Sequence, residues 1–221
     1  LFARETGFKD ALTGFYLLMG TENLYAQNLT YSYLDMLAGR YESAPEIYDW
    51  SALYAYDGTY ESTVNTIYSK IYNIIANINN FLYFVDAKRD VITTPNYYET
   101  MKGEALGLRA FLHFDLLRLF GPMPTRTTAS KILPYVTKVG IEYNTHHSYQ
   151  EFTELLENDL TDAGKLLYPF DPVIPAGEDR EELNLSLSAE NFLTARQIRF
   201  NYYAVKAMEA RFYLWLGGDD N

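Results

Sequence analysis

One segment of this chain, residues 102–124, constrains the fold more than any other. It reads KGEALGLRAFLHFDLLRLFGPMP, in which small residues line one side and large apolar residues recur at helical spacing. A helix with this surface can be approached closely by a second helix. Gly121 can take the left-handed conformation that ends helices, and Pro122 and Pro124 prevent continuation. We therefore expect a buried packing helix that stops near residue 120.

Four other segments repeat apolar residues every three or four positions, which predicts further helices. They cover residues 7–19, 64–86, about 149–168 and about 200–216. Ser148 and Glu151 form a capping-box sequence for the fourth predicted helix, and Gly217-Gly218 is a stop for the last one. Thr94-Pro95 supplies a cap and a first-turn proline for the helix that contains residues 102–120.

These helices predict an all-α fold built from tetratricopeptide-like helical hairpins, with long loop excursions and minor strand content. A clean repeat near 34 residues, which a regular tetratricopeptide array would show, is not visible. The excursions cover residues 20–61, 121–147 and 169–193. Segments of that length inside a compact domain are usually functional or mobile.

Composition narrows the function classes. The 221 residues can form one substantial core or at most two small domains, and 48% of them are hydrophobic. The net charge of −11 argues against a protein that grips a nucleic-acid backbone, which needs a basic face. Because the chain has no Cys, disulfides, thiol catalysis and thiolate metal sites are excluded within it.

Catalytic and metal-binding patterns are weak. We expect His146 and His147 to be solvated loop residues and His113 to lie at a packing edge. Carboxylates are numerous enough for a glycosidase pair, but Glu151, Glu154 and Glu157 have the spacing of a solvated helix face. A second group, on the helix that contains residues 102–120, is expected to be buried and paired for structural reasons: Arg109, Asp115 and Arg118.

The residue type that stands out is Tyr, with 21 copies. Tyr combines a flat apolar face with a hydroxyl, which suits surfaces that bind sugars or proteins. Many tyrosines fall in the excursion at residues 20–61, together with planar polar groups that could hydrogen-bond a sugar. The alternative is that the rings simply close over helix ends. The candidate binding residues are Asp35, Arg40, Tyr41, Trp50 and Tyr54, with Asp57 nearby.

Three segments resemble the SusD/RagB family. The first matches in order at thirteen positions: Glu104, Ala105, Leu108, Arg109, Ala110, Phe114, Asp115, Leu116, Arg118, Leu119, Phe120, Gly121 and Pro124. Residues 201–217 resemble a later family helix. A looser match covers Tyr72, Ile75, Ala76 and Asn77. The segments keep the family's order, and since family members are usually much longer, the chain looks like a single N-terminal SusD-like domain over residues 1–221, truncated at both ends.

The resemblance implies a surface-exposed lipoprotein of the outer membrane, of Bacteroidetes type. Such a protein captures an oligosaccharide or polysaccharide, less often a peptide, and delivers it to a SusC-like TonB-dependent transporter. It would not be an enzyme and would need no cofactor or metal. The lipid anchor would precede Leu1, since the chain holds no lipidation Cys. Two alternatives stay open, a helical-repeat scaffold with a protein ligand and an all-α carbohydrate-active enzyme.

Overall fold

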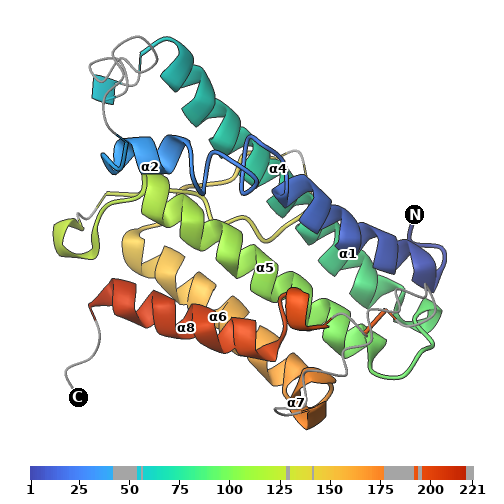
Figure 1. The fold of residues 1–221 in the computed structure, drawn as a ribbon. Coiled ribbons are helices and arrows are strands. Elements are labelled where there is room, and N and C mark those ends of the chain that lie inside the picture. The colour runs from blue at the N-terminus through green and yellow to red at the C-terminus, as the bar shows by residue number, and fades with distance from the viewer. Residues whose placement is uncertain are drawn as a thin grey trace. The chain divides into compact units, whose positions relative to one another are not determined.

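The computed structural model describes residues 1–41, 54–55, 57–127, 130–140, 142–176, 192–193 and 196–217 (Figure 1). The long helices are α1 (Glu5–Met19), α4 (Thr59–Ala87), α5 (Tyr97–Phe120), α6 (Tyr149–Leu167) and α8 (Tyr202–Leu216). Short ones are α2 (Tyr33–Leu37), α7 (Val173–Ala176) and three 3₁₀ turns, η1 (Arg89–Val91), η2 (Pro124–Arg126) and η4 (Arg196–Ile198). Strand pairing in this described part is limited to one antiparallel bridge, Leu133 with His147. The all-α prediction is confirmed.

By contacts between backbone positions, the chain divides into two compact units. Unit 1 comprises Leu1–Leu12 and Ile78–Asn221, and unit 2 comprises Thr13–Asn77. An aromatic cluster of Phe2, Phe8, Phe81 and Phe84 lies in the core of unit 1, with ring centroids 4.8–6.1 Å apart. Unit 2 has its own buried apolar set: Phe15, Leu24, Tyr33, Met36, Ile67, Ile71, Ile74 and Ile75. The description of residues 1–221 as one domain stays a prediction.

Helix α5 is the central element of unit 1. It is buried on every side rather than along one stripe. Helix α6 runs antiparallel beside it, and α8 runs antiparallel to α6 and therefore parallel to α5 (Figure 1). Two glycines permit this close approach. A Cβ on Gly103 would lie 2.8 Å from Leu167 Cγ in α6, and one on Gly107 would lie 2.6 Å from the Phe200 ring. The expected close-packing surface is therefore confirmed.

Two of the predicted helix ends are confirmed by cap geometry. The Ser148 hydroxyl accepts a hydrogen bond from the Glu151 amide, while the Glu151 side chain accepts from the Ser148 amide. Gly217 ends α8 in the left-handed region at φ 111°. Each is a position where the local sequence alone satisfies the free backbone groups at a helix end.

Helix α5 ends at Phe120, which confirms the predicted stop near residue 120, but the caps predicted for its two ends are wrong. The helix begins at Tyr97 after Asn96, which has φ 67°, because the amide and hydroxyl of Thr94 both donate to Glu5 instead (2.9 and 2.8 Å). Gly121 is extended at φ −89° and ψ 170° rather than left-handed. The reason is Pro122, since a proline disfavours helical and related conformations in the residue before it.

Candidate functional site

The predicted binding residues that the structure describes gather around α2 in unit 2. Asp35 lies in the first turn of α2, and Arg40 follows the end of the helix. Their side chains form an ion pair with 3.5 Å between Arg40 Nε and Asp35 Oδ1. The Arg40 side chain remains 72% exposed and that of Asp35 24% exposed, so the pair presents planar polar groups to solvent.

Exposed tyrosines lie in and around the same short segment, and two of their hydroxyls bond to its backbone. The Tyr41 hydroxyl donates to the carbonyl of Tyr31, and the Tyr54 hydroxyl donates to the carbonyl of Leu37 at 3.3 Å. The exposed fractions are 38% for Tyr41, 57% for Tyr54 and 59% for Tyr31. We call Tyr31, Asp35, Arg40, Tyr41 and Tyr54 the α2 surface. It combines exposed aromatic rings with one ion pair.

Two further predicted residues do not extend this description. Trp50 lies outside the described residues. Asp57 is exposed, and its Oδ1 accepts a hydrogen bond from the Gly58 amide at 2.7 Å, a local turn contact. The assignment of these residues to a binding site stays a prediction.

The charged residues of α5 are structural, as expected. Arg109 donates to both carboxylate oxygens of Asp159 at 2.6 and 2.7 Å and to the Asn79 side-chain oxygen at 2.8 Å. The Tyr135 hydroxyl donates to the same Asp159 at 2.6 Å. Asp115 pairs with Arg118 at 3.0 Å. Arg109, Asp115 and Asp159 are buried and compensated inside the fold, so they are not available to a ligand, whereas Arg118 is paired but exposed rather than buried as expected.

A second buried ion cluster was missed from the sequence. Arg196 contacts Glu104 and donates to both oxygens of Asp171, at 3.1 and 2.9 Å, and all three side chains are at most 1% exposed. Asp171 also accepts from the amide of Tyr202 at 3.0 Å, the first residue of α8. The partners lie 92 and 25 positions apart in the sequence. The one available signal was Glu104, a carboxylate on an otherwise buried helix.

His113 lies at no packing edge, contrary to expectation, since it is completely buried. Its Nδ1 is 2.9 Å from the carbonyl oxygen of Arg109, and its Nε2 is 3.0 Å from the amide nitrogen of Val136. Because a carbonyl only accepts and an amide only donates, the ring must be neutral with the proton on Nδ1. Burial lowers the pKa of His113 to about 3, and the nearby Arg109 guanidinium acts in the same direction.

The two adjacent histidines of the following loop differ in exposure and contacts. His146 is exposed, as expected for a solvated residue. His147 is not solvated in that sense, because its Nδ1 accepts a hydrogen bond from the Tyr135 amide at 3.0 Å. Its backbone also makes the bridge to Leu133. His147 thus helps to close the loop.

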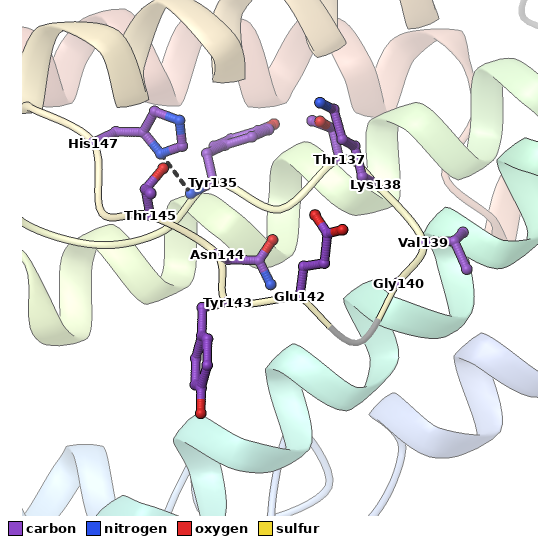
Figure 2. Close-up of a pocket in the computed structure, with 10 residues that line it drawn as sticks. All are labelled: Tyr135, Thr137, Lys138, Val139, Gly140, Glu142, Tyr143, Asn144, Thr145 and His147. Carbon is purple, nitrogen blue, oxygen red and sulfur yellow. Dashed lines mark hydrogen bonds between the residues drawn. The ribbon is translucent and has the colours of Figure 1, made fainter.

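That loop encloses a pocket of about 510 Å³ (Figure 2). Its lining comes from one stretch of chain: Tyr135, Thr137, Lys138, Val139, Gly140, Glu142, Tyr143, Asn144, Thr145 and His147. Figure 2 shows the Glu142 side chain projecting between the two arms of the loop, with Asn144 beside it, while the Tyr143 ring points away. Sequence reasoning identified only an irregular segment here, because no periodicity or motif marks its residues.

The described residues were searched for metal-binding groups and for membrane-spanning helices. No group of three His, Cys, Asp or Glu side chains among them is arranged to hold a metal. None of their helices combines the length and apolar character that a membrane span requires.

The chain was compared with protein-family models and with curated proteins. A family model described as SusD-like, "Starch-binding associating with outer membrane", matches residues 3–170. A search of curated proteins found no match.

Solved structures of similar fold come from Bacteroides. A SusD-like carbohydrate binding protein from Bacteroides vulgatus superposes with a TM-score of 0.66 at 20% identity, over 97% of this chain and 42% of its own. A SusD superfamily protein from Bacteroides thetaiotaomicron gives 0.64 at 21% identity, over 96% of this chain and 42% of its own. Another, from Bacteroides vulgatus, gives 0.64 at 20%, over 97% and 44%. This chain therefore spans less than half the length of these structures.

Proposed function

The chain belongs to the SusD-like family of starch-binding proteins that associate with the outer membrane, and from that premise we propose that it binds a glycan without altering it chemically. The observation that carries the proposal is the α2 surface, which combines exposed tyrosine rings with the Asp35–Arg40 pair. Sugar rings present C–H faces that stack on aromatic rings, and hydroxyls that bond planar polar groups.

The hydroxyl bonds of Tyr41 and Tyr54 support this assignment. They fix each ring through its polar end, so that the apolar face stays exposed. A ring that is already positioned loses less conformational freedom when a ligand stacks on it. We include Trp50 in the proposed site because it follows in the same segment and offers the largest aromatic face.

The proposal extends to the cellular setting. We infer a surface-exposed lipoprotein at the outer membrane that passes an oligosaccharide to a SusC-like TonB-dependent transporter. Support comes from the family description, which associates its members with the outer membrane. Since the chain spans 42% of two matched structures, the activity of the whole protein is proposed on the same basis.

Binding without reaction is favoured over hydrolysis by the state of the helix-surface carboxylates. Glu151 is the cap partner of Ser148, and those hydrogen bonds hold the pKa of its carboxyl below the usual range. Glu154 accepts from Gln150 at 2.8 Å, and Glu157 accepts from Tyr213 at 2.6 Å. A glycosidase needs one carboxyl with a raised pKa to act as general acid. The Glu151 carboxyl is shifted in the opposite direction, and the carboxylates of Glu154 and Glu157 are engaged by Gln150 and Tyr213.

The test is isothermal titration calorimetry of the complete protein against linear gluco-, xylo- and manno-oligosaccharides. Removal of one stacked ring should weaken binding about tenfold, so we expect this loss for Trp50→Ala and Tyr41→Ala. Tyr168→Ala is the matched control, because Tyr168 is an equally exposed tyrosine (62%) in unit 1. Unchanged affinity in both α2-surface variants, for a glycan that the wild type binds, would remove these residues from the site.

A further inference from the structure

The loop at residues 133–147 has a fixed base. The bridge between Leu133 and His147 closes it with hydrogen bonds of 2.7 and 2.9 Å, from Ile132 to His147 and from His147 to Leu133. Just inside the bridge, the Tyr135 amide donates to His147 Nδ1 at 3.0 Å. These contacts set the width of the opening between the two arms.

Buried polar side chains of α4, α5 and α6 hydrogen-bond the same base of the loop. The Tyr135 hydroxyl bonds Asp159, the Val136 amide donates to His113 at 3.0 Å, and the Val136 carbonyl accepts from Asn79 at 2.8 Å. Tyr135 also stacks on His113 with 3.7 Å between ring centroids. The loop is therefore anchored on rigid helices before any ligand arrives.

The tip of the loop has the opposite character. Five exposed polar side chains line the pocket, and none has a hydrogen-bond or ion-pair partner among the described residues: Thr137, Lys138, Glu142, Asn144 and Thr145. They supply two hydroxyls, an amide, a carboxylate and an ammonium group. An anchored base with an unpaired polar tip is the arrangement by which loops on a rigid scaffold bind ligands.

The chemistry of these groups selects the ligand class. One carboxylate and one ammonium group give the lining no net charge, which disfavours anions and metal cations. Donors and acceptors are mixed, as a polyhydroxylated ring requires. The volume of about 510 Å³ lies in the range of small-molecule pockets. We propose that this loop pocket is a second binding site, which takes one neutral sugar unit of a glycan.

A second hollow, which reaches the exposed ring of Tyr83, adjoins the pocket. A wider hollow of about 740 Å³ shares Thr137, Lys138 and Val139 with it and reaches Tyr83, a ring that is 61% exposed on α4. A glycan whose terminal unit enters the loop pocket can thus continue past Lys138 and stack its next unit on Tyr83. The site takes its ligand class from its own side chains and uses no residue of the α2 surface.

The experiment is calorimetry of the complete protein with the same oligosaccharide panel. Glu142→Gln and Asn144→Ala should each raise Kd about two- to tenfold, the value of one or two lost hydrogen bonds. Both should melt like wild type, because neither side chain contacts the core. Asp162→Asn is the matched control, since it removes an exposed carboxylate on α6 that does not line the pocket. Kd should also be nearly the same at low and high salt, as expected for a neutral ligand.

Each contrary outcome has a distinct meaning. If the two loop variants bind as wild type does while Tyr41→Ala binds weakly, the loop proposal is wrong and the function proposed for the α2 surface stands. A steep loss of affinity with salt, or heat from calcium ions alone that Glu142→Gln abolishes, would show a charged ligand or a cation site and overturn the neutral-sugar assignment. A wild type that binds no glycan of the panel would overturn both proposals.

Discussion

At the scale of single residues, the ring pair of His113 and Tyr135 joins the core to the surface loop. His113 receives the Val136 amide on one nitrogen and donates to the Arg109 carbonyl from the other. Local sequence cannot reveal this role, because the partners at 135–136 lie beyond the end of α5. Local sequence could identify Arg109 as a buried charge, because an Arg on a helix with apolar residues on every side must be paired.

The first prediction concerns pH. The pKa of His113 is about 3 in the folded protein and near 6.5 in the unfolded chain, so the unfolded chain binds an extra proton between these values. The free energy of unfolding should therefore fall as pH falls from 6.5 toward 3, by roughly 1 kcal/mol per pH unit from this residue. Chemical denaturation at several pH values measures it. His113→Gln, which cannot titrate, should show a shallower slope, and equal slopes would refute the assignment.

The second prediction compares two arginines on α5. Arg109→Ala leaves the Asp159 carboxylate buried beside Asn79 and Tyr135, which should cost about 3–5 kcal/mol. Arg118→Ala breaks a pair whose arginine side chain is 35% exposed, so it should cost less than about 1 kcal/mol. Thermal and urea denaturation of the two variants provides the measurement. Similar costs would mean that the buried network is not what makes Arg109 important.

At the scale of elements, α5 shows which features a sequence specifies. Its packing surface and its stop near residue 120 were predictable, whereas the conformations at its two ends did not follow from Thr94 and Gly121. Those ends depend on Glu5, which is distant in sequence, and on the conformational effect of Pro122. Ser148 and Gly217 were predictable because each satisfies its own helix end with no help from elsewhere.

A pair of glycine substitutions tests the packing of α5. Gly103→Ala places a methyl group 2.8 Å from Leu167 Cγ and 3.2 Å from the Ala163 carbonyl, so overpacking should cost about 1–3 kcal/mol despite better helix propensity. Gly14→Ala in α1 meets nothing within 4 Å and should stabilise by up to about 1 kcal/mol. Denaturation curves of the two variants measure these changes in the free energy of unfolding. A stabilising Gly103→Ala would show that α6 can move away from α5.

Burial along α5 also differs between neighbours. Leu112 is fully buried, and Leu112→Ala should cost about 2–5 kcal/mol through lost burial and a cavity. Phe111 is only half-buried, with its ring 5.9 Å from that of Phe200, so Phe111→Ala should cost less. Both values come from the same denaturation series. A larger loss for Phe111→Ala would contradict the burial seen here.

At the scale of the whole molecule, the helical class and the order of the helices were predictable, because apolar periodicity is a local property. The loop pocket was not, because its residues have no shared period and are brought together by the bridge of Leu133 and His147. Far-ultraviolet circular dichroism should be dominated by helix, with little strand signal. A mainly strand-like spectrum would be incompatible with the fold.

The fixed base of the 133–147 loop has a consequence for evolution and for engineering. Among the described residues, the anchoring contacts end at Val136 and resume at His147, so the described residues between them can change without disturbing a hydrogen bond of the core. Under the binding role proposed for this loop, mutations there would change what the protein recognises rather than whether it folds. Residues of the loop could then be replaced, by selection or by grafting, to change ligand specificity while the helical scaffold stays constant.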